Sequence, residues 1–336
     1  MSVKIPDFHV PALQARITPS LQVVEAHLLE AVTGARDLVD DLTSHLAQAG
    51  GKRIRPVLTL VCAQLGSDDA ASREKVITAA TAIELTHLAS LYHDDVMDSA
   101  PTRRGTPSAQ HLWGNNRAIL AGDVLFARAS VLIAQLGPET VERHAHTFER
   151  LCLGQLNETF GPTPDADPVD FYLQVLADKT GSLVAAAAHF GAWHGGAGDE
   201  VAEIVAAFGE KVGVAFQIAD DVLDIAAEGT SGKTPGTDLR EGVDTLPVLL
   251  LRRRAERGQI DADGQRILSL LEQDLSSDEL LAELVEALRS HDVLEETRQL
   301  ARTWADEAVA LLDSLPPSEA KIALESFAGL MVDRLA

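Results

Sequence analysis

Cysteine and aromatic residues are scarce in this chain of 336 residues. The two cysteines, Cys62 and Cys152, are too few for a disulfide framework, and neither lies at a spacing typical of a metal site. Aromatic side chains make up only 4% of the residues. Because strands favour aromatic and β-branched residues, whereas the abundant alanine favours helices, this composition indicates an all-helical protein.

Basic residues are also few. The chain has 28 Lys and Arg against 51 Asp and Glu, which gives a formal net charge of −23. A nucleic-acid-binding protein needs a basic surface, and so does a protein that binds anionic lipid through a charged patch. We therefore expect no nucleic-acid partner and no basic membrane-binding surface.

Long apolar runs are missing as well. No stretch reaches the roughly 18 apolar residues that a transmembrane helix needs. The first twenty residues contain no basic segment followed by an apolar region, which a secretory signal would require. We expect no stable membrane insertion and a cytoplasmic location.

Apolar residues recur at helical spacing along most of the chain, and no alternating pattern indicates a strand. The length alone would allow two domains. No linker-like segment interrupts the sequence, so we expect one domain over residues 1–336. The expected helices cover residues 20–49, 72–98, 116–136, 139–159, 170–194 and 199–226, a loop covers 228–245, and amphipathic helices follow over 251–336.

Two segments, 94–98 and 220–224, share the pattern Asp-Asp-x-x-Asp. On a helix, residues four apart differ by about 40° around the axis, so the outer two aspartates face the same way and the middle one lies about 100° aside. Two carboxylates on one apolar helix repel each other unless a cation compensates them. One such cluster could equally be a solvated helix end, but two copies favour metal binding. Ligands that are all oxygen suit Mg²⁺ rather than zinc.

Several of the few basic residues accompany these clusters, with Arg103 and Arg104 just after the first cluster and Lys233 in the loop after the second. Alone, each could form an ordinary surface ion pair, which contributes little to stability. Together they suggest a phosphorylated substrate that is bound both by metal ions and directly, because Arg and Lys bind phosphate oxygens well. These residues are Lys52, Arg53, Arg55, Arg103, Arg104, Lys179 and Lys233.

These motifs resemble those of the trans-isoprenyl diphosphate synthases, and most closely the bacterial long-chain polyprenyl diphosphate synthases. They occur in the family's order between about residues 45 and 250. The resemblance implies an all-α, single-domain isoprenoid-synthase-type helical bundle around a deep central cavity, usually as a homodimer. The matching segments are Gly50-Gly51-Lys52-Arg53-Ile54-Arg55-Pro56, His93-Asp94-Asp95-Val96-Met97-Asp98, Arg103-Arg104-Gly105, Lys179-Thr180-Gly181 and Phe216-Gln217-Ile218-Ala219-Asp220-Asp221-Val222-Leu223-Asp224.

The resemblance also implies a reaction. A Mg²⁺-dependent prenyltransferase condenses isopentenyl diphosphate with an allylic diphosphate such as farnesyl diphosphate. Three Mg²⁺ ions hold the allylic diphosphate, whose departure leaves a cation that the double bond of isopentenyl diphosphate attacks. The expected product is an all-trans-polyprenyl diphosphate of about thirty to fifty carbons for a quinone side chain, such as that of menaquinone.

By position, the resemblance assigns roles to individual residues. The implied metal ligands are Asp94, Asp98, Asp220 and Asp224, with Asp95 and Asp221 acting through water or a second layer. The implied catalytic residues are Asp94, Asp98, Asp220, Lys179 and Arg103.

The two diphosphates have separate implied partners. His87 alone would be interpreted as a core histidine, but it lies two helical turns before Asp94 on the same face. Isopentenyl diphosphate matches Lys52, Arg55, His87 and Arg104. The allylic diphosphate matches Arg103, Lys179, Thr180, Gln217 and Lys233.

Chain length is expected to depend on the residues just before Asp94. Short-chain members of the family tend to carry aromatic residues at the positions of Ala89 and Ser90, which are small here. Thr86 and Leu85 lie deeper and could set the next limit. We expect a product longer than farnesyl diphosphate, although small residues at these positions could simply permit close helix packing.

One position departs from the family's pattern. Many relatives carry a lysine directly after the glycine that matches Gly242, and this chain has Val243. Lys233 would then have to supply the contact, and Asp238 would organise the loop.

Other functions fit part of these features. A geranylgeranyl diphosphate synthase would differ only in product length. A terpene cyclase would not need the basic set that includes Lys52 and Arg55. A non-catalytic subunit of a two-component synthase would be expected to lose the acidic clusters, and a simple acidic metal-binding protein would not need the ordered basic residues.

Overall fold

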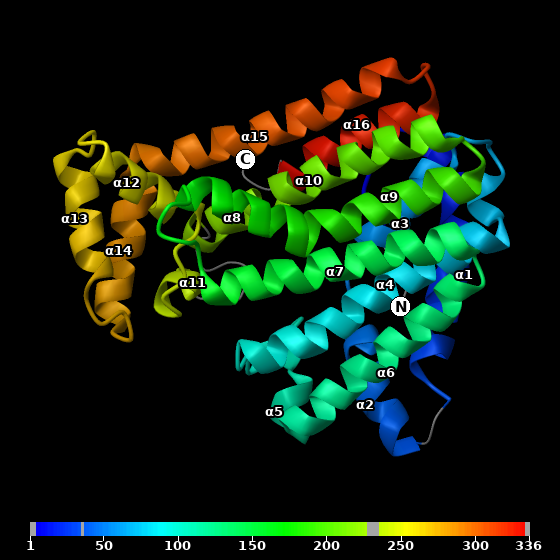
Figure 1. The fold of residues 1–336 in the computed structure, drawn as a ribbon, viewed down its shortest axis with the longest axis horizontal. Helices are drawn as coiled ribbons and strands as arrows, with labels where there is room; N and C mark the ends of the chain where they lie inside the picture. Colours follow the sequence, from blue (N-terminus) through cyan, green and yellow to red (C-terminus); the bar gives the residue numbers. More distant parts are fainter. Residues whose placement is uncertain (1–4, 35–36, 227–234, 333–336) are drawn as a thin grey trace. The chain divides into compact units, whose positions relative to one another are not determined.

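The computed structural model describes residues 5–34, 37–226 and 235–332. Within these ranges the chain is almost entirely helical, as the sequence predicts (Figure 1). The exception is a hairpin of two antiparallel two-residue strands, β1 (Thr102–Arg103) and β2 (Thr106–Pro107). The contacts within the chain divide it into two compact units.

Unit 1 is assembled from Met1–Glu149, Leu183–Gly209 and Leu311–Phe327. It holds the β1–β2 hairpin and the parts of helices that fall in these stretches. Those helices are α1 (Pro11–Val32), α2 (Asp37–Gln48), α3 (Ile54–Ala63), α4 (Glu74–Met97), α5 (Ala109–Trp113), α6 (Asn115–Ala134), α7 (Pro138–Phe160), α9 (Ser182–Gly195), α10 (Asp199–Ala226) and α16 (Glu319–Val332), with 3-10 turns at Ala70–Ser72 and Leu312–Ser314.

Helix α4 forms the interior of unit 1. Every residue from Val76 to Thr86 is buried, so this part of the helix has no solvent-facing stripe. It packs against α1, α3 and α6, which Figure 1 shows around it. Burial ends only at the last turns, where the first acidic motif lies. The fold therefore fixes the helix that carries Asp94 on several sides.

Unit 2 is assembled from Arg150–Ser182, Glu210–Ala310 and Ala328–Ala336. It contains the second parts of α7 and α10. The other elements are α8 (Pro168–Leu176), a π-helical turn (Ala177–Gly181), α11 (Thr237–Arg240), α12 (Leu246–Glu256), α13 (Ala262–Leu271), α14 (Asp278–Ser290) and nearly all of α15 (Asp292–Leu311).

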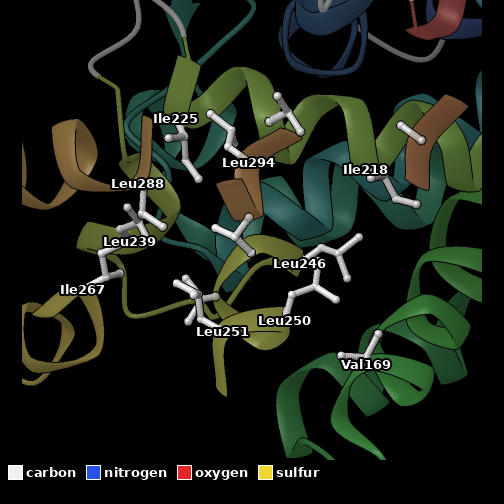
Figure 2. Packing of buried hydrophobic residues seen from close by; sticks show 14 of the residues in the cluster. Val169, Ile218, Ile225, Leu239, Leu246, Leu250, Leu251, Ile267, Leu288 and Leu294 are labelled. Carbon is white, nitrogen blue, oxygen red and sulfur yellow. The ribbon is translucent and has the colours of Figure 1, made fainter. Parts of the chain in front are cut away.

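The core of unit 2 fixes the helix that carries the second acidic motif. Ile218 and Ile225 of α10 are buried in one cluster with Leu246 and Leu250 of α12 and Leu294 of α15 (Figure 2). Burying one such side chain stabilises the fold by about 1.5–3 kcal/mol. The apolar face of α10 is thus held in place, and the outer aspartates of the motif, Asp220 and Asp224, are half-buried.

The boundaries between the units fall inside helices α7, α9, α10, α15 and α16. Each unit combines stretches that are far apart in the sequence. The single domain expected over residues 1–336 stays a prediction.

Several observed helix boundaries agree with those predicted from the sequence. Helix α10 covers residues 199–226, as expected, and α4 begins two residues later than expected. The single helix expected over residues 20–49 is wrong, because α1 already begins at Pro11 and ends at Val32, before α2 starts. The chain over 170–194 is helical but contains the π turn, and α11 lies within the expected loop.

In the described part of the chain, all helices are too short or too polar to span a lipid bilayer.

Candidate active site

The first acidic motif occupies the C-terminal end of α4 in unit 1. Asp94 is half-buried, and Asp98 is exposed and occupies the C-cap position, directly after the last residue of the helix. Asp95 is fully buried, and its Oδ1 accepts a hydrogen bond of 2.6 Å from Arg103 Nε. Burial raises the pKa of Asp95, and Arg103 partly offsets this increase. The helical geometry thus separates the outer aspartates from the middle one, as the spacing predicts.

The β1–β2 hairpin is tied to the rest of unit 1 by two consecutive arginines. Arg103 pairs with the buried Asp95. Arg104 has a positive φ of 54° and donates from Nη1 to the carbonyl of Leu46 at 2.9 Å and to that of Gly50. The hairpin therefore joins the end of α4 to the turn that follows α2.

A buried ion-pair cluster lies beneath this turn. Arg53 is 3% exposed and donates from Nε to Glu25 Oε1 at 2.5 Å and from Nη1 to Glu84 Oε1 at 3.1 Å. Its Nη2 also donates to the carbonyl of Ala47 at 3.1 Å. Arg53 consequently has a structural role inside the protein. Its neighbours Lys52 and Arg55, by contrast, are predicted to bind isopentenyl diphosphate.

Glu84 is the shared counter-charge of this cluster. Burial raises the pKa of its carboxyl group, and the positive charges of Arg53, Arg55 and Arg104 act in the opposite direction. Sequence reasoning missed Glu84 and Glu25 as parts of the site. The available signal was that Glu84 is an acidic residue inside the apolar stretch of α4.

The residues predicted to bind isopentenyl diphosphate lie around this cluster. Lys52 is exposed, and the Nε of Arg55 is shielded from solvent without a hydrogen-bond partner in the described structure. Burial lowers the pKa of His87 well below its usual value, and Arg55 and Arg104 lower it further. His87 is therefore neutral at pH 7 and donates from only one ring nitrogen. The buried Nε of Arg55, which has no hydrogen-bond partner in the described structure and lies beside other positive charges, suits an anionic ligand.

The second acidic motif repeats this arrangement on α10 in unit 2. Asp220 and Asp224 are half-buried, whereas Asp221 is 6% exposed. Asp221 Oδ2 accepts hydrogen bonds from Tyr172 Oη at 2.8 Å and from the amide of Leu246 at 3.2 Å. Burial raises the pKa of Asp221 to about 8, and these two hydrogen bonds act in the opposite direction. Asp221 therefore links α10 to α8 and to the start of α12.

Asp224 holds the beginning of α11. Its two carboxylate oxygens accept hydrogen bonds of 3.3 Å from the amides of Thr237 and Asp238, and its carbonyl accepts one of 2.8 Å from Gly236. The amide of Asp238 thus contacts Asp224, and the expected role of Asp238 in organising the loop stays a prediction. Val243, where many relatives have lysine, is 42% exposed.

The predicted allylic-diphosphate residues divide between the units. Arg103 belongs to unit 1, whereas Lys179 and Thr180 lie in the π turn of unit 2 and are half-buried. Lys179 Nζ is 2.5 Å from Glu158 Oε2 of α7. Gln217 lies one turn before Asp220 on α10 and is also half-buried. Lys233 lies outside the described residues.

The donor chemistry of both motifs fits Mg²⁺. No group of three or more His, Cys, Asp or Glu side chains is arranged to hold a metal ion among the described residues. A structural zinc site needs four such ligands, whereas Mg²⁺ binds one or two carboxylates and keeps water or substrate phosphates at its other positions.

Comparison with known proteins identifies the family. The family model described as polyprenyl synthetase matches residues 36–288. The chain belongs to the polyprenyl synthetase family. It is similar to the nonaprenyl diphosphate synthase of Mycobacterium tuberculosis, with 43% identity over 94% of this chain and 92% of that protein. It is also 36% identical to heptaprenyl diphosphate synthase component 2 of Geobacillus stearothermophilus, over 94% and 96% of the two chains.

A solved structure supports the same assignment. The geranylgeranyl pyrophosphate synthase from Corynebacterium glutamicum, complexed with calcium and isoprenyl diphosphate, superimposes with a TM-score of 0.85. The identity is 41%, and 99% of each chain is covered. This polyprenyl synthetase is therefore an all-α trans-prenyltransferase, as the motifs predict.

The predicted chain-length residues of this polyprenyl synthetase lie inside unit 1. Ala89 is fully buried in a cluster that includes Leu85 and residues of α1, α2 and α6. Helix α6 approaches closely at Gly122, where a Cβ would lie 3.2 Å from the carbonyl oxygen of Ala89. Ser90 is 9% exposed and donates to the carbonyl of His87 at 2.9 Å. The lack of a side chain at Gly122 thus permits the close packing of α6 on α4, and Ala89 is enclosed in the same cluster.

Thr86 has a polar partner that the sequence did not reveal. Its Oγ1 donates to the carbonyl of Ala82 at 2.9 Å and lies 3.0 Å from Nε2 of the buried His144 of α7. Burial lowers the pKa of His144. The side chain of Thr86 is thereby held between α4 and α7.

The cluster around Glu84 generates a stability prediction. Glu84→Gln leaves the buried Arg53 with one fewer counter-charge, so we expect the free energy of unfolding to fall by about 3 kcal/mol or more. Urea denaturation measures this change. The control is Glu319→Gln, which removes the partly exposed partner of Arg16 and should cost at most about 1 kcal/mol. Equal losses in the two variants would contradict the proposed importance of the buried cluster.

Proposed function

We propose that this prenyltransferase joins isopentenyl diphosphate to an allylic diphosphate such as farnesyl diphosphate. The product is an all-trans-polyprenyl diphosphate of about thirty to fifty carbons for a quinone side chain, such as that of menaquinone. The two aspartate motifs carry this proposal, because each leaves its outer aspartates partly or fully exposed while the middle one is buried. The similarity to a nonaprenyl diphosphate synthase supports the long product.

Asp94, Asp98, Asp220 and Asp224 are the residues that would hold Mg²⁺, and we expect three ions. Bound Mg²⁺ supplies Lewis-acid stabilisation of the departing diphosphate. The calcium and isoprenyl diphosphate in the Corynebacterium glutamicum relative support a divalent ion. Asp95 and Asp221 orient the motifs from inside, through Arg103 and Tyr172 respectively.

Lys52, Arg55, His87 and Arg104 bind isopentenyl diphosphate in this proposal. The unpaired Nε of Arg55 and the neutral ring of His87 donate hydrogen bonds, and the arginines supply positive charge. Such fixed charges stabilise an anion without reorganising during the reaction. They also offset locally the net charge of −23, which would otherwise repel a diphosphate.

The allylic diphosphate is bound by Arg103, Lys179, Thr180, Gln217 and Lys233. Lys179 exchanges its contact with Glu158 for one with phosphate oxygens, which carry more charge. Excluding water from the space around the allylic diphosphate prevents water from trapping the allylic cation.

Two alternatives follow from specific similarities. The 41% identity to a geranylgeranyl pyrophosphate synthase favours a shorter product as the second candidate. The similarity to a synthase component 2 raises the possibility of a second, different subunit. Both acidic motifs are present here, which supports a catalytic chain in either case. The cytoplasmic location stays a prediction.

We also propose that the enzyme is a homodimer that associates through α6. Leu120 and Val131 are 62% and 63% exposed, and eleven residues place them on the same side of the helix. Ile119, about 100° around the helix from Leu120, is 41% exposed. A second copy would bury this apolar surface, since isolated soluble chains rarely expose contiguous apolar patches.

The dimer proposal predicts the effect of a charge in this surface. Leu120→Glu should shift the mass measured by light scattering from dimer to monomer. Ile322→Glu on α16, where Ile322 is 49% exposed, is the matched control and should remain dimeric. A parent enzyme that is monomeric at micromolar concentration would refute the proposal.

Incorporation of radiolabelled isopentenyl diphosphate with farnesyl diphosphate and Mg²⁺ tests the reaction. We expect Asp94→Asn and Asp220→Asn each to lower kcat by about 10²-fold or more, because a bound metal ion lowers the activation barrier by several kcal/mol. Asp306→Asn, an exposed position on α15, is the control and should retain activity. No incorporation by the pure parent protein would contradict the proposal and favour a two-component enzyme.

Product sizing tests the chain-length assignment. Ala89→Phe should shorten the product, because the larger side chain occupies space beside the growing chain. Since Ala89 also packs against α6, Ser90→Phe is the second variant, and thermal unfolding shows whether each is folded. Unaltered product lengths in folded variants would show that these residues do not set the limit.

A further inference from the structure

We infer that Arg150 is a positioning residue for the allylic diphosphate, because it holds the π turn that presents Lys179 and Thr180. The inference rests on the proposed function of Lys179. Arg150 lies on α7 and belongs to unit 2, as do all residues of the turn. No motif in the sequence includes it.

The π turn is the only irregular segment in an otherwise continuous helical stretch from Pro168 to Gly195. Such turns are rare within helices and are frequently found at functional sites. The turn spans Ala177–Gly181 and contains the whole Lys179-Thr180-Gly181 motif. Something outside the segment must therefore favour it over a regular helix.

Arg150 provides two contacts that fix the turn. Its Nε donates to Asp178 Oδ1 at 2.8 Å, and its Nη1 donates to Glu210 Oε2 at 2.6 Å. The other oxygen of Asp178 accepts a hydrogen bond of 2.9 Å from Gln174 Nε2. Asp178 is only 13% exposed and directly precedes Lys179. One guanidinium thus ties the turn to α7 and to α10 at the same time.

Close backbone contacts complete the support on the same two helices. A Cβ at Gly154 of α7 would lie 2.7 Å from the amide nitrogen of Lys179. A Cβ at Gly181 would lie 3.1 Å from the carbonyl oxygen of Glu210 on α10. The turn therefore sits directly against both helices, and a change in its shape must disturb the contacts of Arg150.

In this arrangement one residue, Arg150, holds the turn, and another, Lys179, is left to bind the substrate. Arg150 uses its charge on Asp178 and Glu210, while Lys179 reaches the partly exposed Glu158, two turns further along α7. Because Arg150 holds the turn through the side chain of Asp178, the residue directly before Lys179, its loss should change where the Lys179 ammonium group lies. The affinity for the allylic diphosphate should then fall, whereas the affinity for isopentenyl diphosphate, assigned to residues of unit 1, should not.

The test measures both affinities by calorimetry on the full-length enzyme with Mg²⁺. The probes are a non-reactive thiolo analogue of farnesyl diphosphate and isopentenyl diphosphate. Losing a hydrogen bond to a charged group weakens binding by about tenfold or more, so Arg150→Gln should weaken binding of the analogue about tenfold or more and leave isopentenyl diphosphate binding within about twofold. Arg150→Lys, which keeps the charge but lacks the fork, should give an intermediate value.

The chain offers a matched control in the same unit. Arg254 also bridges two carboxylates, at 2.7 Å to Asp292 and 2.5 Å to Glu296, and its side chain is 27% exposed against 37% for Arg150. Arg254→Gln should leave the affinity for the analogue unchanged, and it should lower stability less than Arg150→Gln because its partners are 73% and 42% exposed. Equal losses of affinity in Arg150→Gln and Arg254→Gln would overturn the inference. If Arg150→Gln does not fold, Glu210→Gln, which removes one of the two pairs, gives the same comparison.

A third variant separates this inference from the proposed function. If Lys179→Ala binds the analogue as tightly as the parent, both the role of Lys179 and the inference are wrong. If Lys179→Ala binds weakly but Arg150→Gln does not, only the inference is wrong. Weak binding in both, with Arg254→Gln unaffected, supports it.

Discussion

A charge that is taken out of water must meet an opposite charge or a hydrogen bond, and this constraint organises both parts of the site. In unit 1 the buried Glu84 lies beneath the arginines of the turn before α3. In unit 2 Arg150 satisfies Asp178 and Glu210. The helices that carry the aspartate motifs are therefore held by polar contacts as well as by apolar packing.

The same constraint explains the internal division of each motif. The middle aspartates, Asp95 and Asp221, are buried and engaged by Arg103 and Tyr172. The outer aspartates remain nearer the surface, where a hydrated cation can reach them. Three identical side chains thus occupy two different environments, because helical geometry turns the middle one away from the outer two.

Much of this arrangement follows from the sequence alone. The apolar periodicity predicted the helices α4 and α10, the spacing of the aspartates predicted that the outer two share a face while the middle one lies aside, and the resemblance of the motifs indicated the family. That the middle aspartate is the buried one was not predicted. The partners of buried charges could not be predicted, because Glu25, Glu84 and Arg150 meet their partners across long sequence separations. The sequence showed that Lys179-Thr180-Gly181 interrupts an apolar helix, but not that the chain forms a π turn, since that shape depends on α7 and α10.

The central proposal is that binding of a metal-complexed diphosphate requires both aspartate motifs. Binding of Mn²⁺, followed by electron paramagnetic resonance with and without the thiolo analogue of farnesyl diphosphate, tests it most directly. We predict that the analogue strengthens Mn²⁺ binding in the parent enzyme, that Asp94→Asn and Asp220→Asn each abolish this enhancement, and that the double variant is no worse than either. An enhancement that persists in either single variant, or losses that add independently, would contradict the claim.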